Sequence, residues 1–327
     1  MINQRILNNI SILIVNTNEG SVLLRCLEAI YRDRNSSHFQ VIVGDNASTD
    51  GLINNVNAKY PDVKIINNSR NIGFTRANNK LINESKSEFV LFLNPDAFVR
   101  GDAITDLSQF LIQNPSVGVV GPKLLNNDGS LQLVDMRYPC WQTPFIDSIS
   151  LKRAFGKDPI PRKITQRFYN AKEPIEVDWV MGSCLMTRRS ILEDVGYFDE
   201  RYFIYFEDVD LCYRIKTKGW IINYYPSCEV IHLGGTGLVL YNSRKIFEIH
   251  CSEMKFFQKY YPPFMTYLLI IGIIFKSIIR IFQWQIAFLD FSQFSLDKMN
   301  GYIRVIRHFI HIRKHKNERP NWKTTIK

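Results

Sequence analysis

Three carboxylates fall within four positions near the middle of the chain, at Glu207, Asp208 and Asp210. We expect a helix to begin near Phe206, directly after an aromatic run. Its geometry would place Glu207, Asp210 and Arg214 on one face, while Asp208 points about 100° away from Glu207. This arrangement predicts an Asp210–Arg214 ion pair and leaves one carboxylate free for chemistry. In the alternative interpretation, the acids only favour the start of a helix, where the helix dipole stabilises each by ~0.3–1 kcal/mol.

The chain before this stretch alternates between strand and helix patterns. The expected strands are 10–15, 39–43, 63–66, 88–93 and 117–120, and the expected helices are 21–31, 73–83 and 105–112. Such alternation predicts an α/β fold with a mostly parallel, doubly wound sheet. Polar clusters follow three of the strands, at 16–18, 45–50 and 94–96. We expect these clusters to meet at one rim, because ligands of such sheets bind beyond the carboxyl ends of the strands.

The composition is that of a folded protein, with 46% hydrophobic and 22% charged residues in a chain of 327. The six cysteines are scattered without metal-ligand spacing, which predicts reduced core residues of a cytosolic protein. The first nine residues are polar and predict no signal peptide. Beyond the middle, we expect a long excursion at 138–174 and two short strands at 220–225 and 229–232.

The net charge of +10 is concentrated near the carboxyl end, where residues 298–327 hold nine Lys or Arg against Glu318. An anionic membrane surface and nucleic acid are both candidate partners for such a tail. The twelve-residue apolar run 264–275, which Lys276 and Arg280 end, favours the membrane and disfavours nucleic acid. Because a bilayer span needs about 20 residues, we expect a helix in the headgroup region, with an ordinary core helix as the alternative.

Seven motifs occur together in this chain, at 12–16, 43–50, 71–74, 93–96, 179–183, 206–208 and His232. In their order and spacing they resemble family-2 glycosyltransferases, and are most similar to the bacterial rhamnosyltransferase-type members, from about residue 10 to about 261. The resemblance implies an A-type glycosyltransferase fold, with a Rossmann-like, mostly parallel sheet and helices on both faces. It implies a catalytic domain at 1–261, with a donor-binding half at about 1–125 and an acceptor half at about 175–261. We expect 262–327 to be a helical, membrane-associated extension.

The family uses nucleotide-diphosphate sugars with a divalent cation, Mg²⁺ or Mn²⁺. The resemblance implies that Asp45 accepts a hydrogen bond from a pyrimidine N3–H; the alternative role for this residue is an Asx turn with Asn46 and Ser48. Asp96 would hold the metal, and His232 would contact the metal or the diphosphate; the alternatives are a simple turn at 94–96 and a hydrogen-bonded histidine at a strand end. Asn94 departs from the family's Asp-x-Asp motif, which predicts weak metal affinity without nucleotide. The expected nucleotide-binding residues are Asn16, Asn18, Asp45, Asn46, Arg76, Asn94 and Asp96. Thr17 stands where many relatives carry a base-stacking Tyr.

The family mostly inverts the anomeric centre, which requires a base on the acceptor side, opposite the leaving diphosphate. The resemblance assigns this role to Asp208 and leaves Glu207 to orient hydroxyl groups. Trp179, Gly182, Glu207 and Trp220 are the expected acceptor-binding residues, although a buried core position is the commoner fate of tryptophan.

The sequence therefore predicts an inverting transferase that moves a sugar to a polyprenyl-diphosphate-linked or polysaccharide acceptor in cell-surface glycan synthesis. The expected donor is dTDP-L-rhamnose, from which L-rhamnose would be transferred. A UDP-hexose or UDP-N-acetylhexosamine is the alternative donor. A sugar-phosphate nucleotidyltransferase and a non-catalytic nucleotide-sugar-binding scaffold are alternatives of other classes. We expect a cytoplasmic protein, peripheral on the inner face of the cell membrane and bound to its anionic surface, and leave open whether it is a homodimer.

Overall fold

The computed structural model describes residues 9–132, 134, 136–149, 168, 170–234, 242–283 and 293–314. The chain divides into two compact units, which are described separately below. The first comprises Met1–Tyr138 with Ile160–Val239, and the second comprises Pro139–Pro159 with Leu240–Lys327. This division places 240–261 in the second unit, whereas the resemblance groups that segment with the catalytic domain. The predicted boundary at residue 261 separates a catalytic domain from a membrane-associated extension, and it stays a prediction.

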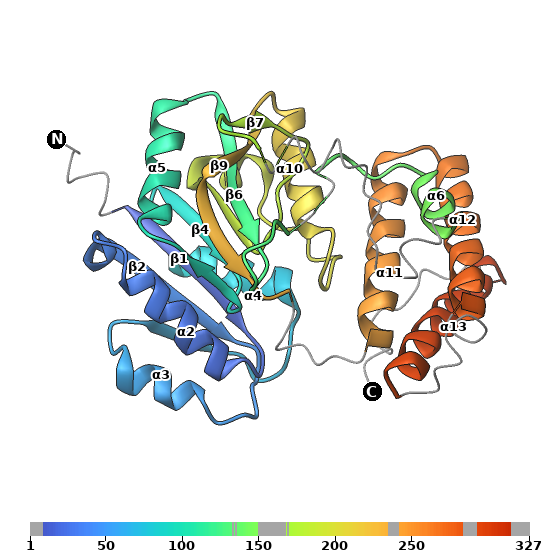
Figure 1. Ribbon diagram of the computed structural model, residues 1–327, viewed down its shortest axis with the longest axis horizontal. Helices are drawn as coiled ribbons and strands as arrows, with labels where there is room; N and C mark the ends of the chain where they lie inside the picture. The colour runs from blue at the N-terminus through green and yellow to red at the C-terminus, as the bar shows by residue number, and fades with distance from the viewer. Residues whose placement is uncertain are drawn as a thin grey trace. The chain divides into compact units, whose positions relative to one another are not determined.

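A mixed sheet forms the centre of the first unit (Figure 1). Its strands are β1 (Ile10–Asn16), β2 (Phe39–Asp45), β3 (Lys64–Asn67), β4 (Phe89–Leu93), β5 (Ala97–Val99), β6 (Val117–Leu125), β7 (Ile175–Glu176), β8 (Cys184–Arg188) and β9 (Ile221–His232). They lie in the order β3-β2-β1-β4-β8-β6-β9-β5, and β7 pairs with β9. The first four of these are parallel, as expected, and β8 then runs antiparallel to both β4 and β6.

Helices cover both faces of this sheet. They are α2 (Gly20–Tyr31), η1 (Ser36–His38), α3 (Ile53–Lys59), α4 (Phe74–Glu84), α5 (Ala103–Gln113), α9 (Arg189–Val195) and α10 (Glu207–Thr217). Successive side chains of a strand point to opposite faces. Ile12 of β1 therefore lies in one apolar cluster with Leu27 of α2. Its neighbour Leu13 lies in a second cluster with Leu81 of α4 and Leu211 of α10. Burial on both faces is why these strands read as continuous apolar runs.

The structure differs from the sequence-based expectation at the edges of this unit. The two strands expected at 220–225 and 229–232 form the single strand β9, whose pairing with β6 is interrupted by a bulge near Pro122. The helices α3 and α9 and the strand β5 are short and were not expected. The excursion expected at 138–174 contains the short helix α6 (Thr143–Ile149), and its residues 150–167 and 169 lie outside the described residues.

The described part of the second unit is helical, and consists of α6, α11 (Asn242–Tyr260), α12 (Pro263–Phe282) and α13 (Gln293–Lys314). The helix α12 has 20 residues and continues through Lys276 and Arg280, so it is longer than the twelve-residue apolar run 264–275, whose length predicted that the segment is too short to span a bilayer. Among the described helices it is the one that is long and apolar enough to cross a membrane, by length and composition. The Lys276 ammonium lies 3.1 Å from the Asp147 carboxylate of α6, and the Arg280 guanidinium donates to the Asp147 carbonyl oxygen at 3.1 Å.

Candidate active site

Two loops at the carboxyl ends of β1 and β2 form a hydrogen-bonded rim. Asn16 and Asp45 are register partners, and the Asn16 amide donates to Asp45 Oδ1 at 3.0 Å. The Ser48 N–H, three residues further on, donates to Asp45 Oδ2 at 3.0 Å, so the carboxylate is held by its own loop. Asn18 joins the loops, because its Oδ1 accepts from the Thr49 N–H at 2.6 Å. Three of the residues expected to bind nucleotide thus lie together, and that role stays a prediction.

Asn46 and Arg76 differ in their relation to this rim. The buried Asn46 amide donates to the Gly73 carbonyl oxygen at 3.4 Å and accepts from Asn68 at 3.0 Å, so it belongs to the rim. Arg76 instead pairs with Glu200 at 3.3 Å, and both side chains are about half exposed. The hydrogen bonds of the described residues do not connect Arg76 to the rim.

Asp96 and His232 meet although they lie far apart in the sequence. Antiparallel pairing sets Ala97 of β5 opposite His232 at the end of β9, and the Leu233 N–H donates to the Asp96 carbonyl oxygen at 3.1 Å. Asp96 Oδ1 lies 3.3 Å from His232 Nε2, and both side chains are buried. Among the described residues, no third His, Cys, Asp or Glu joins them in a metal-binding group. A buried carboxylate facing an imidazole nitrogen fits a divalent cation whose other ligands come from substrate and water.

Gln132 is a further member of this site that the sequence analysis missed. Its Oε1 lies 2.7 Å from His232 Nδ1, and its amide nitrogen donates to the His232 carbonyl oxygen at 3.2 Å. A tight turn after β6, closed by the Asn126 N–H donating to the Ser130 carbonyl oxygen at 2.8 Å, directs the chain back toward β9. In the sequence, a single glutamine after a turn carries no signal that it contacts a histidine 100 residues away.

Glu19 was also missed. It follows β1 at the start of α2, is 8% exposed, and its Oε2 has no hydrogen-bond partner among the described residues. Burial, followed by the negative charge of Asp96, raises the pKa of Glu19 to about 7. A buried carboxyl group is not expected here from sequence, because the residue lies in a polar loop.

The loop before α10 is strained and held in place by α4. Tyr205 and Phe206 both adopt left-handed backbone conformations, with φ of 67° and 66°, which cost energy for residues other than glycine. The Thr75 hydroxyl donates to the Tyr202 carbonyl oxygen at 2.6 Å, and the Phe74 N–H donates to the Phe203 carbonyl oxygen at 2.8 Å. These bonds fix the position from which α10 begins.

The expected ion pair within α10 is present. Arg214 Nε lies 2.8 Å from Asp210 Oδ2, and Asp210 is fully buried. Arg214 also donates to the carbonyl oxygens of Val195 and Tyr197, at 2.7 and 2.6 Å. Asp210 and Arg214 therefore anchor the helix and leave the other two acids to the site.

Glu207 and Asp208 are both buried but have different surroundings. Asp208 Oδ2 accepts from the Gly182 N–H at 2.8 Å, and Oδ1 accepts from the Val209 N–H at 2.8 Å. Glu207 Oε2 has no hydrogen-bond partner among the described residues. Burial raises the pKa of both groups, while the two N–H donors favour ionised Asp208 and the negative charge of Asp208 raises the pKa of Glu207 further. Asp208 therefore ionises first, and Glu207 keeps its proton to higher pH.

The strand β8 brings this pair to the same rim as Asp96. The Asn94 N–H, at the end of β4, donates to the Ser183 carbonyl oxygen at 2.9 Å, immediately beside Gly182. Trp179 lies on the same segment, where its indole N–H donates to the Arg137 carbonyl oxygen at 3.0 Å. Trp220 does not reach this rim, because it precedes Ile221 and so lies at the opposite end of β9 from His232.

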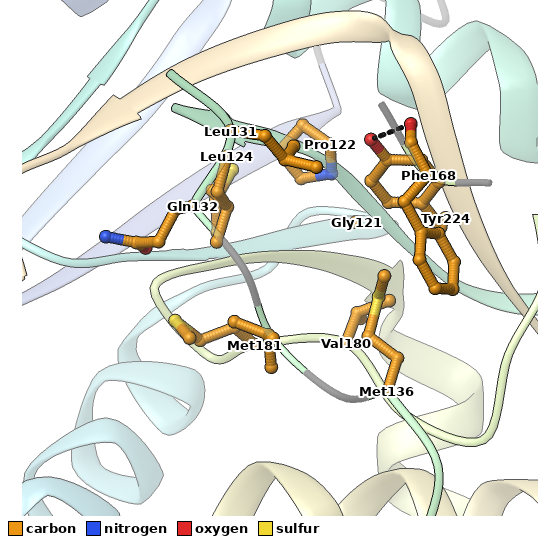
Figure 2. A pocket seen from close by; sticks show the side chains of 12 residues that line it. Gly121, Pro122, Leu124, Leu131, Gln132, Met136, Phe168, Val180, Met181 and Tyr224 are labelled. Carbon is orange, nitrogen blue, oxygen red and sulfur yellow. Dashed lines mark hydrogen bonds between the residues drawn. The ribbon is translucent and has the colours of Figure 1, made fainter. Parts of the chain in front are cut away.

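Residues of β6 and of the segment before β8 line a small apolar cavity (Figure 2). Its wall includes Gln132, which contacts His232, and Val180 and Met181, which lead directly to Gly182. Leu124 and Leu131 lie around it in Figure 2, together with Tyr224, whose hydroxyl donates to the Phe168 carbonyl oxygen at 3.3 Å. The cavity thus offers an apolar surface whose lining includes the partner of His232 and the neighbour of Gly182.

Comparison with known proteins extends these observations. Residues 8–246 match the model of the family described as "Glycosyltransferase like family 2". The N-acetylglucosaminyl-diphospho-decaprenol L-rhamnosyltransferase of Mycobacterium tuberculosis is 34% identical over 209 residues, which cover 59% of this chain and 66% of that protein. The chain thus spans just under two thirds of the length of this relative. The rhamnosyltransferase WbbL of Escherichia coli is 28% identical over 231 residues, which cover 68% of this chain and 82% of that protein.

Solved structures share the fold. The mannosyltransferase PcManGT from Pyrobaculum calidifontis, in complex with GDP-Man and Mn²⁺, aligns with a TM-score of 0.57 at 15% identity, covering 95% of this chain and 88% of that one. GalNAc-T7 with UDP, GalNAc and Mn²⁺ aligns with a TM-score of 0.52 at 16% identity, covering 68% of this chain and 43% of that one. The A-type glycosyltransferase fold expected from the motifs is therefore correct.

Proposed function

Because this chain belongs to glycosyltransferase-like family 2, we propose that it transfers a sugar from a nucleotide-diphosphate donor to an acceptor hydroxyl with inversion. The observation that carries the proposal is the unequal pair at the start of α10. Asp208, whose carboxylate is held by the Gly182 and Val209 N–H groups, is the general base. It takes the proton of the acceptor hydroxyl as that oxygen bonds to the anomeric carbon and the nucleoside diphosphate leaves. Glu207, which holds its proton to higher pH than Asp208 does, can donate a hydrogen bond to a substrate oxygen when protonated.

Asp96 and His232 are the groups that would hold a divalent cation, Mg²⁺ or Mn²⁺. When bound, such a cation supplies stabilisation of the negative charge that grows on the leaving diphosphate. Asn94 offers only a neutral oxygen where the family carries a second carboxylate. The diphosphate is therefore expected to complete the metal site.

For the donor, we favour dTDP-L-rhamnose. Two relatives named above are rhamnosyltransferases, and a third, RfbF of Shigella flexneri, is named a dTDP-rhamnosyl transferase. The apolar cavity beside Met181 supports the same choice, because rhamnose carries a methyl group where a hexose carries CH₂OH. An apolar wall would leave that hydroxyl without a hydrogen-bond partner. A UDP-hexose or UDP-N-acetylhexosamine is the alternative donor.

For the acceptor, we favour a polyprenyl-diphosphate-linked glycan at the inner face of the cytoplasmic membrane. The mycobacterial relative's name describes such an acceptor, and α12 has the surface that a bilayer requires. One side of this helix exposes six large apolar side chains: Phe264, Tyr267, Ile271, Phe275, Ile278 and Phe282. They extend over about 27 Å, at 1.5 Å per residue. Lys276 and Arg280 do not interrupt this face, because both turn toward Asp147.

The distribution of charge favours an anionic lipid surface over an apolar protein partner. Residues 1–239 contain 26 basic and 26 acidic side chains, whereas 240–327 contain 15 basic and five acidic ones. The whole net charge of +10 thus lies in the part of the chain that carries the apolar face. Each Lys or Arg near an anionic surface adds about 1 kcal/mol of attraction at moderate ionic strength.

The function is tested with purified protein, a panel of donors and a polyprenyl-diphosphate-linked N-acetylglucosamine acceptor. We expect release of dTDP from dTDP-L-rhamnose only when acceptor is present, and much slower release from UDP-glucose and UDP-N-acetylglucosamine. The Asp208→Asn variant serves as the control for contaminating enzymes. Faster release from a UDP-sugar would replace the donor assignment, and nucleotide binding without release from any donor would favour a non-catalytic scaffold.

A further inference from the structure

Gln132 holds both polar ends of its amide in defined contacts. The amide nitrogen donates to two oxygens, the His232 carbonyl at 3.2 Å and Asn126 Oδ1 at 3.4 Å. Because an NH₂ group donates and both of these oxygens only accept, the orientation of the amide is settled by its partners. Its Oε1 must then be the atom that faces His232 Nδ1 at 2.7 Å.

This orientation determines which imidazole nitrogen carries the proton. An amide oxygen can only accept, so His232 Nδ1 must be the donor in the contact with Gln132. In a neutral imidazole the other nitrogen then bears a lone pair. That nitrogen, Nε2, is the one that lies 3.3 Å from Asp96 Oδ1. Two electron-pair donors thus face each other in a buried site, which is the arrangement that a cation between or beside them would stabilise.

We propose that Gln132 is a positioning residue that holds His232 as the Nδ1–H tautomer and thereby keeps Nε2 available, together with Asp96, for a divalent cation. This inference rests on the metal role proposed above for Asp96 and His232. Without Gln132, the alternative tautomer becomes favourable, because an Nε2–H would donate directly to the Asp96 carboxylate. That hydrogen bond would occupy both metal ligands at once.

The tautomer is measured directly, in metal-free protein with ¹⁵N-labelled histidine, by long-range ¹H–¹⁵N correlation at about pH 9, where histidine side chains are generally neutral. Six histidines give few signals, and His232→Gln identifies the relevant one. We expect wild-type His232 to carry its proton on Nδ1. An Nε2–H signal in the wild type would overturn the proposal without any variant.

Two substitutions at position 132 separate positioning from packing. Gln132→Met keeps the length of the side chain in an apolar surrounding but removes the acceptor, whereas Gln132→Glu keeps an acceptor. We expect Nε2–H in the Met variant and Nδ1–H in the Glu variant. An unchanged Nδ1–H signal in the Met variant would show that Gln132 does not set the tautomer.

Metal affinity provides the second measurement, by electron paramagnetic resonance of free Mn²⁺ during titration of protein saturated with dTDP. We expect Gln132→Met to weaken Mn²⁺ binding ~10–100-fold, the usual effect of losing a group that orients a metal ligand, and Gln132→Glu to retain it. Equal affinity in the Met variant and the wild type overturns the inference and leaves the proposed function intact. If wild-type protein with dTDP binds no Mn²⁺, the metal role assigned to Asp96 and His232 is wrong, and the inference about metal binding falls with it.

Discussion

The first unit buries acids at the rim of an apolar sheet, whereas α12 of the second unit turns its two charged side chains inward and exposes apolar ones. Asp45, Asp96 and Asp208 lie buried at strand ends or a helix start, where N–H groups, an imidazole or a small polar side chain contact them. In the second unit, Asp147 holds Lys276 and Arg280 while the outer side of α12 is apolar. The first pattern suits binding of a polar substrate from water, and the second suits contact with lipid.

The difference is what the proposed contact of α12 with lipid would require. In water, an exposed apolar stripe is unfavourable and a buried charge must be paired. Both features of α12 become favourable if lipid covers the stripe. If the first unit carries the chemistry and α12 the lipid contact, substitutions in the first unit will change catalysis and nucleotide binding but not vesicle binding. Substitutions on the outer face of α12 will do the reverse.

The largest effect is expected for Asp208→Asn. The substitution is nearly isosteric and removes the proposed general base, so transfer should fall by at least ~10²-fold. Nucleotide affinity, measured by calorimetry, and vesicle binding should remain close to wild type. The variant Asp210→Asn tests whether the base is correctly assigned. It changes the partner of Arg214 and leaves Asp208 in place, so its turnover should fall less than that of Asp208→Asn. Near-normal turnover in Asp208→Asn would remove this residue from the role.

The next effect concerns the cation. We expect EDTA to abolish transfer. Asp96→Ala should weaken nucleotide binding at least ~10-fold when Mn²⁺ is present, because the Asp96 carboxylate and the diphosphate bind the same ion. Binding measured without metal should change little, which makes the metal-free titration the control. Full activity in chelator would contradict the metal role and leave charge stabilisation to other groups.

A smaller effect is expected for Ile271→Asp on the outer face of α12. The residue is 56% exposed, so the fold should tolerate the change. Sedimentation with anionic vesicles should weaken about tenfold, since removal of a half-buried Ile from lipid costs on the order of 1–2 kcal/mol. Gln258→Asp, at an exposed position of α11, changes the charge equally and should weaken binding much less. Equal losses in the two variants would mean that charge, and not the apolar face, carries the contact.

The smallest effect concerns the pH dependence of stability in metal-free protein. The pKa of Glu19 is raised in the folded state, to about 7, so the folded chain holds this proton more tightly than the unfolded chain does. Stability from this group is complete below the ordinary pKa of a glutamate and is lost as the pH rises through about 7. Glu19→Gln should therefore raise Tm by a few degrees near pH 8 and leave it almost unchanged near pH 4. The same shift at both pH values would mean that the buried charge is not responsible.

The sequence by itself determined the features that depend on near neighbours in the chain. The runs that form β1, β2 and β4 and the helical period of α2 follow from local side-chain pattern. The Asp210–Arg214 pair follows from the i,i+4 geometry of one helix. The motifs also identified the family, because their order and spacing can be read without knowing where the strands lie.

Only the tertiary structure decided the features that depend on strand order. The reversal at β8, which brings Gly182 and Asp208 beside Asn94, requires knowing that this strand pairs with β4. Gln132 and His232 are 100 residues apart and meet only because β6 and β9 are neighbours. The same strand geometry separates Trp220 from the rim.

The second unit shows most clearly that sequence pattern does not reveal what packs against a charged side chain. In the sequence, Lys276 and Arg280 end an apolar run and argue against deep contact with lipid. In the structure they lie on the side of α12 that faces Asp147, 129 positions earlier in the chain than Lys276. Sequence pattern gives the charge of a side chain and its angle around a helix. Whether that charge meets water, lipid or a buried partner is set by what packs against the helix, and that is a property of the folded chain alone.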